Sequence, residues 1–169
     1  MAAAMAKLWA SDHVAPTNIS LRHAFTLHVE LQAPVMVGTT YLGERRVIPI
    51  VGGHFAGERL RGRVLAGGAD WNVVRPDGVM HVWARYEIET DDGAVVSVLN
   101  EGLIRVTLEQ VARLDAGQPS AIDRWYARTS PRFETAAPRY RWLNEAVFIG
   151  DLHPPKTPAA VTIDVHEVL

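Results

Sequence analysis

The chain of 169 residues contains no cysteine. Disulfide bonds, thiolate catalysis and cysteine metal ligands are therefore excluded. Three catalytic signatures are missing as well: the HExxH zinc motif, the GxxxxGK[ST] phosphate loop and the GxSxG nucleophile elbow. The glycine pairs in "VGGHFAG" and "LAGGADW" fit neither a phosphate-loop spacing nor a strand-to-helix setting. The sequence thus disfavours zinc proteases, P-loop proteins and serine hydrolases.

Strong charge of either sign is also missing, because the formal net charge is only −2. A nucleic acid or an anionic membrane is therefore not an expected partner. The longest uncharged stretch, residues 31–43, contains Pro34 and falls far short of the ~20 apolar residues that a membrane span needs. The opening "MAAAMAKLWASDHV" lacks the apolar core of a secretion signal. We expect a cytoplasmic protein with a flexible arm at residues 1–20 and a single domain at residues 21–169.

Alternating apolar and polar residues dominate the rest of the chain. In "FTLHVEL", residues 25–31, every second residue is apolar, which is the pattern of a half-buried strand. Further β-rich runs cover residues 35–42, 45–55, 61–75, 79–90, 94–106, 122–130, 140–150 and 160–168. One short helix is predicted near residues 107–116, with Thr107 and Gln110 forming a capping box. About eight or nine strands with one helix predict an all-β fold, a single antiparallel β-barrel.

Two turns set the register of three neighbouring strands. "RPDGV" and "TDDGA" have the residue pattern of a type I turn with a G1 bulge, which places Arg75 opposite Val79 and Thr90 opposite Ala94. One face then carries small and apolar residues with few polar ones: Val64, Ala66, Gly68, Asp70, Asn72, Val74, Met80, Val82, Ala84, Tyr86, Ile88, Val96, Val98 and Asn100. The other face carries Trp71, Trp83 and most of the charged residues. We expect the first face to line the lumen, although a register error of one residue would exchange the two faces.

Four ordered motifs resemble one family over residues 22–169. They are "RRVIPIVGGHFAGERLRGRVLAGGADW", "RYEIETDDG", "RFETAAPRYRWLN" and "VTIDVHEV". The family consists of uncharacterised small barrels of bacteria and fungi, a domain of unknown function. The resemblance implies an antiparallel barrel similar to allene oxide cyclase and, more distantly, to lipocalins. It also implies a reaction style, since cofactor-free cyclisation by addition of an alcohol to an alkene has been ascribed to some fungal relatives. In "GGHF" the family resemblance leads us to expect a small hydroxyl residue where this chain has His54, so substrate preference would differ here if that position lines the pocket.

Asp70 is the main candidate for catalysis. A carboxylate on an apolar inner wall has a raised pKa, which suits a general acid or base near neutral pH. Asp70, Ala84 and Asn100 are predicted to share one row across the first face, with Tyr86 one step along. Asn100 and Tyr86 are therefore candidates for orienting a bound oxygen. The structural alternative is that Asp70 only accepts hydrogen bonds from backbone amides after "GGA".

Other candidates lie outside this sheet. Glu134 is a second candidate acid, and Arg128 a candidate partner for an anion or enolate; alternatively the two form a structural ion pair. If Asp70 and Glu134 shared a cavity, mutual repulsion would separate their pKa values and assign acid and base roles. Trp142 is predicted to share a strand face with Tyr140 and Asn144, where it would either line the pocket beside an aromatic substrate or pack in the core.

The remaining aromatic and histidine residues allow two expectations. Trp71 and Trp83 form an apolar pair on the second face, which would need covering by the helix, the termini or another subunit if that face is external. A homo-oligomer through this face is therefore expected. The histidines show no ligand spacing, and His23 and His28, five residues apart on one strand, are predicted to point to opposite faces. We expect no metal and no cofactor.

The family resemblance, together with a carboxylate expected in the lumen, implies a cofactor-independent enzyme that binds a small hydrophobic molecule in its lumen. It would act by acid/base catalysis as an isomerase, cyclase or (de)hydratase-type lyase on an aromatic or alkenyl compound. Asp70 would move the proton, and Asn100 and Tyr86 would position the substrate. A non-catalytic barrel that carries or senses a small molecule remains the alternative. An interaction module that uses the Trp71/Trp83 face is weaker.

Overall fold

A computed structural model describes residues 18–105, 107–116, 125–155, 157 and 159–169. Its elements along the chain are β1 Leu21–Leu31, β2 Val35–Thr40, β3 Gly43–Ala56, β4 Arg61–Val64, β5 Ala69–Val74, β6 Val79–Thr90, β7 Val95–Arg105, α2 Leu108–Asp115, β8 Tyr126–Glu134, the 3-10 turn η2 Pro138–Tyr140, α3 Trp142–Glu145, β9 Phe148–Leu152 and β10 Ala160–Val168. The predicted arm at residues 1–20 lies almost wholly outside the described residues.

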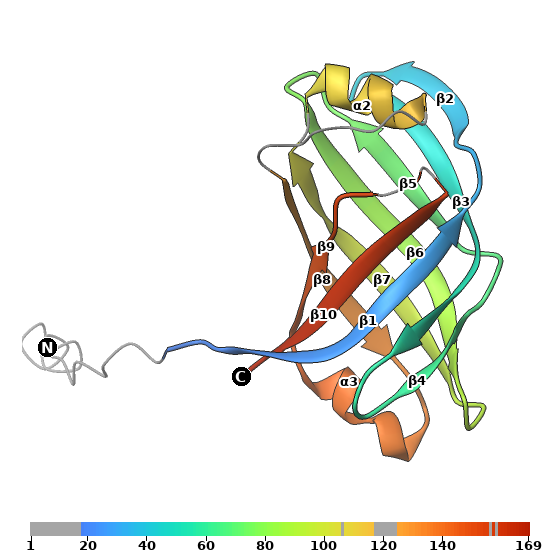
Figure 1. Cartoon of the computed structure of the whole chain (residues 1–169), viewed down its shortest axis with the longest axis vertical. Helices are drawn as coiled ribbons and strands as arrows, with labels where there is room; N and C mark the ends of the chain where they lie inside the picture. The colour runs from blue at the N-terminus through green and yellow to red at the C-terminus, as the bar shows by residue number, and fades with distance from the viewer. Residues whose placement is uncertain (1–17, 106, 117–124, 156, 158) are drawn as a thin grey trace, which may run out of the picture.

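The strands form one antiparallel sheet that closes on itself. Its order is β1-β10-β9-β8-β7-β6-β4-β3, and pairing of β1 with β3 closes the ring. β4 and β5 share one position in the ring, because each pairs with both β3 and β6. β2 extends the sheet beside the first part of β3. The prediction of an all-β antiparallel barrel is confirmed, and Figure 1 shows the strands wrapped around one lumen.

Local sequence signals account for the hairpins and for the helix. The amide of Arg75 donates to the carbonyl of Val79, and the amide of Thr90 donates to that of Ala94, each at 2.9 Å. Glycines at the third loop positions have φ values of +82° and +83°, which residues with side chains rarely adopt. The predicted capping box is present too: the Gln110 amide donates to Thr107 Oγ1 at 3.1 Å, and the Thr107 amide donates to Gln110 Oε1 at 2.7 Å.

Two predicted strands are wrong in part. The run at residues 61–75 is split into β4 and β5 by a turn at residues 65–68, where Gly67 has a φ of +114°. The run at residues 140–150 becomes a strand only from Phe148 onward, because η2 and α3 precede it. Asn144 holds this helical segment in place, since its amide group accepts from the Thr135 amide at 3.0 Å and donates to the Thr135 carbonyl at 2.8 Å. The hydrogen bonds between Asn144 and the residue after β8 thus favour a helical segment, although the alternation in "YRWLN" predicts a strand.

The two ends of the barrel differ. At the end near α3, aromatic rings fill the lumen, with centroids 5.0–5.8 Å apart among Phe25, Phe55, Phe133 and Phe148. α2 lies at the opposite end (Figure 1). None of these four rings lines the open part of the lumen. In the described part of the chain, no helix has the length and apolar character to cross a membrane.

Candidate functional site

A cavity of about 200 Å³ occupies the lumen. Most of its wall is aliphatic, from β1, β3, β6 and β10: Val29, Leu31, Ile48, Ile50, Val82, Ala84, Val161 and Ile163. The polar side chains of Arg46, Asp70, Asn72, Tyr86 and Asn100 also line it. The first face of the β5–β6–β7 sheet therefore lines the lumen. An apolar cavity with a few convergent polar groups is the usual form of a small-molecule site.

The hairpin registers place Asp70 as predicted. Asp70 lies opposite Ala84 on β6, and Ala84 lies opposite Asn100 on β7, so the three form one row. Tyr86 lies two residues further along β6, pairs with Val98 and points to the same side. The sheet thus brings Asp70, Tyr86 and Asn100 into one cavity.

Asp70 accepts a hydrogen bond on each carboxylate oxygen. The backbone amide of Trp83 donates to Oδ1 at 2.8 Å, and Asn72 Nδ2 donates to Oδ2 at 3.1 Å. Backbone capping of Asp70 is therefore real, but the amide comes from the neighbouring strand β6 and not from the segment after "GGA". Burial raises the pKa of the Asp70 carboxyl, while the bonds from Trp83 and Asn72 and the Arg46 and His81 charges act in the opposite direction. The net effect is a carboxyl group that holds its proton to higher pH than an exposed aspartate.

Arg46 and Asn72 complete a polar chain that ends at Asp70. Arg46 Nε donates to Asn72 Oδ1 at 3.1 Å, and a second Arg46 nitrogen lies 3.7 Å from Met80 Sδ. Both Arg46 and Asn72 are buried. Since a guanidinium only donates, it fixes the Asn72 oxygen toward itself and the Asn72 nitrogen toward Asp70. The hairpin register predicts Asn72 on the lumen face but assigns it no role. Arg46 was not predicted as a site residue, although its position two residues before Ile48 and four before Ile50 places all three on one strand face.

Tyr86 and Asn100 line the cavity, and each side chain contains a buried polar atom. Their side chains are 2% and 4% exposed. Neither Tyr86 Oη nor Asn100 Oδ1 has a hydrogen-bond partner among the described residues. Burial raises the pKa of the Tyr86 phenol, so its oxygen stays protonated at neutral pH.

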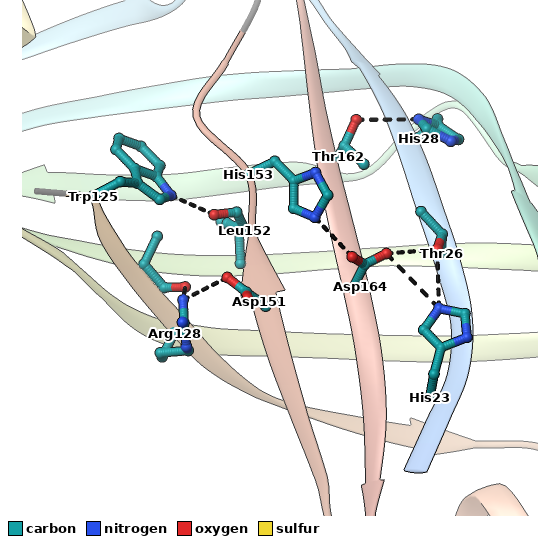
Figure 2. Close-up of polar contacts among 11 residues, drawn as sticks. His23, Thr26, His28, Trp125, Arg128, Asp151, Leu152, His153, Thr162 and Asp164 are labelled. Carbon is teal, nitrogen blue, oxygen red and sulfur yellow. Dashed lines mark hydrogen bonds and ion pairs between the residues drawn. The ribbon is translucent and has the colours of Figure 1, made fainter. Parts of the chain in front are cut away.

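Glu134 and Arg128 lie on the outside of the barrel. Along β8 the inward positions belong to Ala127, Thr129, Pro131 and Phe133, and the residues between them are exposed. The possibility that Glu134 and Asp70 share one cavity is therefore not realised. Arg128 pairs with Asp151 of β9 at 2.5 Å and not with Glu134 (Figure 2). Strand alternation explains both positions.

His54 and Trp142 also lie away from the cavity. His54 is exposed on β3, and its ring stacks on that of His28 with centroids 4.6 Å apart. Trp142 belongs to α3 at the filled end, where the Arg59 guanidinium lies 3.8 Å from its ring centroid. Neither residue lines the lumen cavity. The condition under which His54 would alter substrate preference is therefore not met.

The prediction that His23 and His28 point to opposite faces is wrong. An irregularity in the β1–β10 register between His23 and Phe25 adds a residue, so both Ala24 and Phe25 are buried and both histidines are exposed. Figure 2 shows His23 and His153 on either side of Asp164, at 3.8 Å and 2.7 Å from its oxygens. Among the described residues, no group of three histidine, aspartate or glutamate side chains is arranged to hold a metal ion.

Trp71 and Trp83 form their pair on the outer face. Their ring centroids are 5.5 Å apart and the rings are tilted by 63°. Trp71 remains 37% exposed. An oligomer through this face stays a prediction.

The geometry defines a class of protein: a small closed antiparallel barrel with an apolar cavity in its lumen and a buried polar cluster. The chain belongs to the family described as "Protein of unknown function (DUF3237)", whose model matches residues 19–168. The family resemblance is thereby confirmed. A UPF0311 protein of Rhodopseudomonas palustris is 40% identical over 152 residues, which cover 90% of this chain and 98% of that protein.

Solved structures show the same barrel. A β-barrel-like protein of Acinetobacter baumannii, 34% identical, aligns with a TM-score of 0.80 over 93% of this chain and 100% of its own. An enzyme from Penicillium herquei, 21% identical, aligns with a TM-score of 0.67 over 91% of this chain and 97% of its own. At that identity the likeness concerns the fold alone.

Proposed function

We propose that this protein is a cofactor-independent acid/base enzyme, an isomerase, cyclase or lyase that acts on a small hydrophobic molecule in the lumen. The observation that carries the proposal is the Asp70 carboxyl group, which lines an apolar cavity and has a raised pKa. A carboxyl group in such surroundings exchanges a proton closer to neutral pH than an exposed one does. Asp70 therefore suits the role of proton carrier.

The proposed chemistry needs only proton transfer. Asp70 gives a proton to one position of the bound molecule and regains a proton from another, so the carboxyl group is regenerated at the end of the cycle. Arg46 and Asn72 keep the carboxylate oriented through the bonds at 3.1 Å. The aliphatic wall keeps bulk water from competing for the reactive intermediate. The Penicillium herquei barrel is an enzyme, which supports catalytic use of this fold, although a fold alone does not define a reaction.

Solvent deuterium exchange tests this proposal whatever the product is. The protein is incubated in deuterated buffer with a panel of alkenyl phenols, and mass spectrometry follows deuterium uptake. We expect the wild type to incorporate deuterium into at least one compound. In Asp70→Asn the rate of deuterium uptake should fall about a hundredfold or more. Asp91→Asn, at an exposed turn, is the matched control and keeps the rate. Exchange that persists in Asp70→Asn contradicts the proposed role.

One observation favours a second candidate, a non-catalytic carrier or sensor. Both carboxylate oxygens of Asp70 already accept hydrogen bonds, from Trp83 and Asn72. A carboxylate so engaged also fits a purely structural polar cluster in a binding cavity. Binding of the panel compounds to the wild type without any deuterium exchange supports this carrier.

A further inference from the structure

One amide group in the cavity wall offers a hydrogen-bond donor to the lumen. Asn100 is 4% exposed and lines the cavity. Its Oδ1 atom is fully buried. Its Nδ2 atom donates to none of the described residues and yet is not fully buried, so Nδ2 is the atom of this amide that meets the cavity. A donor in such a place favours a ligand that accepts from it, since it otherwise loses its bonds to water without replacement.

The described side chains around Asn100 offer no accessible acceptor beside this donor. Asn100 pairs with Ala84 on β6 and with Pro131 on β8, and neither side chain is polar. Its diagonal neighbours on these strands are Val82, Tyr86, Thr129 and Phe133. The hydroxyl oxygens of Tyr86 and Thr129 are fully buried, so a molecule in the cavity does not reach them. A ligand group held by Asn100 therefore accepts a hydrogen bond without donating one to the wall.

A carbonyl group meets this requirement. Its oxygen accepts from Asn100 Nδ2, and it has no hydrogen of its own to place. A hydroxyl group would also accept from Nδ2, but its hydrogen would face an apolar wall and stay unpaired, which costs about as much as a lost hydrogen bond. A carboxylate would bring a net charge into an apolar cavity that already contains the Asp70 carboxyl group. Asn100 thus favours a neutral carbonyl oxygen.

The same group relates the ligand to Asp70. Asp70 lies across Ala84 from Asn100, so the two backbones are roughly 10 Å apart. Both side chains line the lumen, and the curvature of a closed barrel brings inward side chains closer together. A carbonyl oxygen held at Asn100 therefore leaves the neighbouring carbon atoms of the ligand on the side of Asp70.

We infer that the lumen binds a neutral, largely apolar carbonyl compound, with its oxygen on Asn100 Nδ2 and the carbon atoms beside the carbonyl facing Asp70. The inference deepens the proposed function, on which its catalytic part rests, and names an unsaturated ketone as the substrate class. A cavity of about 200 Å³ is somewhat larger than an engineered apolar cavity of roughly 150 Å³ that binds benzene. A ketone with one ring therefore suits its size.

The proton transfer balances within one substrate molecule. The Asp70 carboxylate takes a proton from the CH2 group between the carbonyl and a C=C bond, and the electron pair of that C–H bond moves onto the carbonyl oxygen to give a dienolate. The growing negative charge strengthens the hydrogen bond from Asn100 Nδ2. Asp70 then returns the proton to the far carbon of the former C=C bond, the C=O bond re-forms, and the C=C bond lies in conjugation with it. No second reactant is consumed.

Three one-ring probes test the binding part of the inference on the full chain. Acetophenone contains the carbonyl oxygen, α-methylstyrene has a CH2 group in its place, and 1-phenylethanol has a hydroxyl group. Dissociation constants are measured by NMR titration at pH 7. We expect acetophenone to bind about tenfold more tightly than either of the others, which corresponds to one hydrogen bond. Acetophenone binding no tighter than α-methylstyrene, or no tighter than 1-phenylethanol, overturns the inference without any variant being needed.

Two variants assign the selectivity to its residue. Asn100→Leu keeps a side chain of similar size without the donor and is expected to remove the advantage of acetophenone over α-methylstyrene. Ile104→Val changes an aliphatic part of the same wall and is the matched control, in which the affinities of the three probes change alike. A carbonyl preference that persists in Asn100→Leu contradicts the role of Asn100.

Cyclohex-3-en-1-one tests the substrate class. Its isomerisation to cyclohex-2-en-1-one is followed by the ultraviolet absorbance of the conjugated ketone. We expect the wild type to accelerate this reaction, Asp70→Asn to lose about a hundredfold or more of the rate, and Asn100→Leu to lose about tenfold to a hundredfold. A rate that falls in Asp70→Asn but not in Asn100→Leu supports the proposed function and overturns the role of Asn100. Carbonyl-selective binding without isomerisation overturns the substrate class, and the deuterium exchange then decides the proposed function separately.

Discussion

Replacement of Tyr86 by phenylalanine is expected to stabilise the ligand-free protein. Tyr86 is 2% exposed and its hydroxyl group has no partner among the described residues. An unpaired buried hydroxyl costs about 1–3 kcal/mol, and phenylalanine keeps the ring while removing the oxygen. We therefore expect the free energy of unfolding to rise by about 1 kcal/mol or more. For a chain of this length, each kcal/mol corresponds to a rise of about 2–4 °C in Tm.

Tyr140 provides the matched control, since the same atom is removed in a different setting. Its hydroxyl group donates to Asp92 Oδ1 at 2.9 Å, and the residue is buried as well. Hydrogen bonds from Thr90 and Tyr140 hold the pKa of Asp92 below its usual range. Tyr140→Phe is expected to lower the free energy of unfolding and to raise the pKa of Asp92. The two substitutions should therefore change stability in opposite directions.

Urea unfolding, followed by circular dichroism, measures both variants against the wild type under identical conditions. The linear extrapolation is compared only if the m-values agree, so that the unfolded states expose similar surface. A loss of stability in Tyr86→Phe equal to that in Tyr140→Phe would refute the reasoning. It would mean that the Tyr86 hydroxyl group is paired by an ordered water in the ligand-free lumen.

Three further outcomes follow from the structure. Burial raises the pKa of the Asp70 carboxyl in the folded protein above its unfolded value of 3.8. The contribution of Asp70 to stability is therefore complete below pH 3.8 and is lost as the pH rises through the folded pKa. Urea unfolding at several pH values should show the wild type losing stability relative to Asp70→Asn from about pH 4 upward. Gly68→Ala should lower the free energy of unfolding by about 1–3 kcal/mol in the same assay, since its Cβ would lie 2.4 Å from Tyr86 Cβ. An unchanged free energy of unfolding would contradict this packing. Asn144→Ala leaves the amide and carbonyl of Thr135 without their side-chain partner and should cost about 1–3 kcal/mol, whereas a neutral effect would show that the η2–α3 segment holds without it.

Strand alternation and turn chemistry allowed much of the barrel to be predicted. Each of the two three-residue loops sets which residues pair in its hairpin, because a glycine at a positive φ ends the turn at a defined residue. That register extends along β5, β6 and β7, so the row of Asp70, Ala84 and Asn100 was available from the sequence. Tyr86 follows from the same alternation. The capping box at Thr107 is equally local, which explains why the helix was predicted correctly.

Residues paired across long sequence separations could not be placed in this way. Arg46 reaches Asn72 because β3 pairs with β5, and the intervening β4 breaks the simple hairpin order. No loop length defines that register, so the polar chain to Asp70 was missed. Glu134 looked like an acid near the lumen until the pairing of β7 with β8 placed it outside.

The sequence by itself determined the antiparallel barrel, its hairpins and the face that carries Asp70, because these depend on the two-residue period of a strand and on short turns. Only the tertiary structure decided which polar groups meet inside. The bulge that turns His23 outward and the contact between Arg46 and Asn72 each depend on a neighbour distant in sequence. The helical turn that removes Trp142 from a strand depends on the hydrogen bonds between Asn144 and Thr135, which strand alternation does not predict. Closure of the sheet finally turns one face into an enclosed lumen, where burial raises the pKa of Asp70 and leaves Tyr86 and Asn100 facing the cavity.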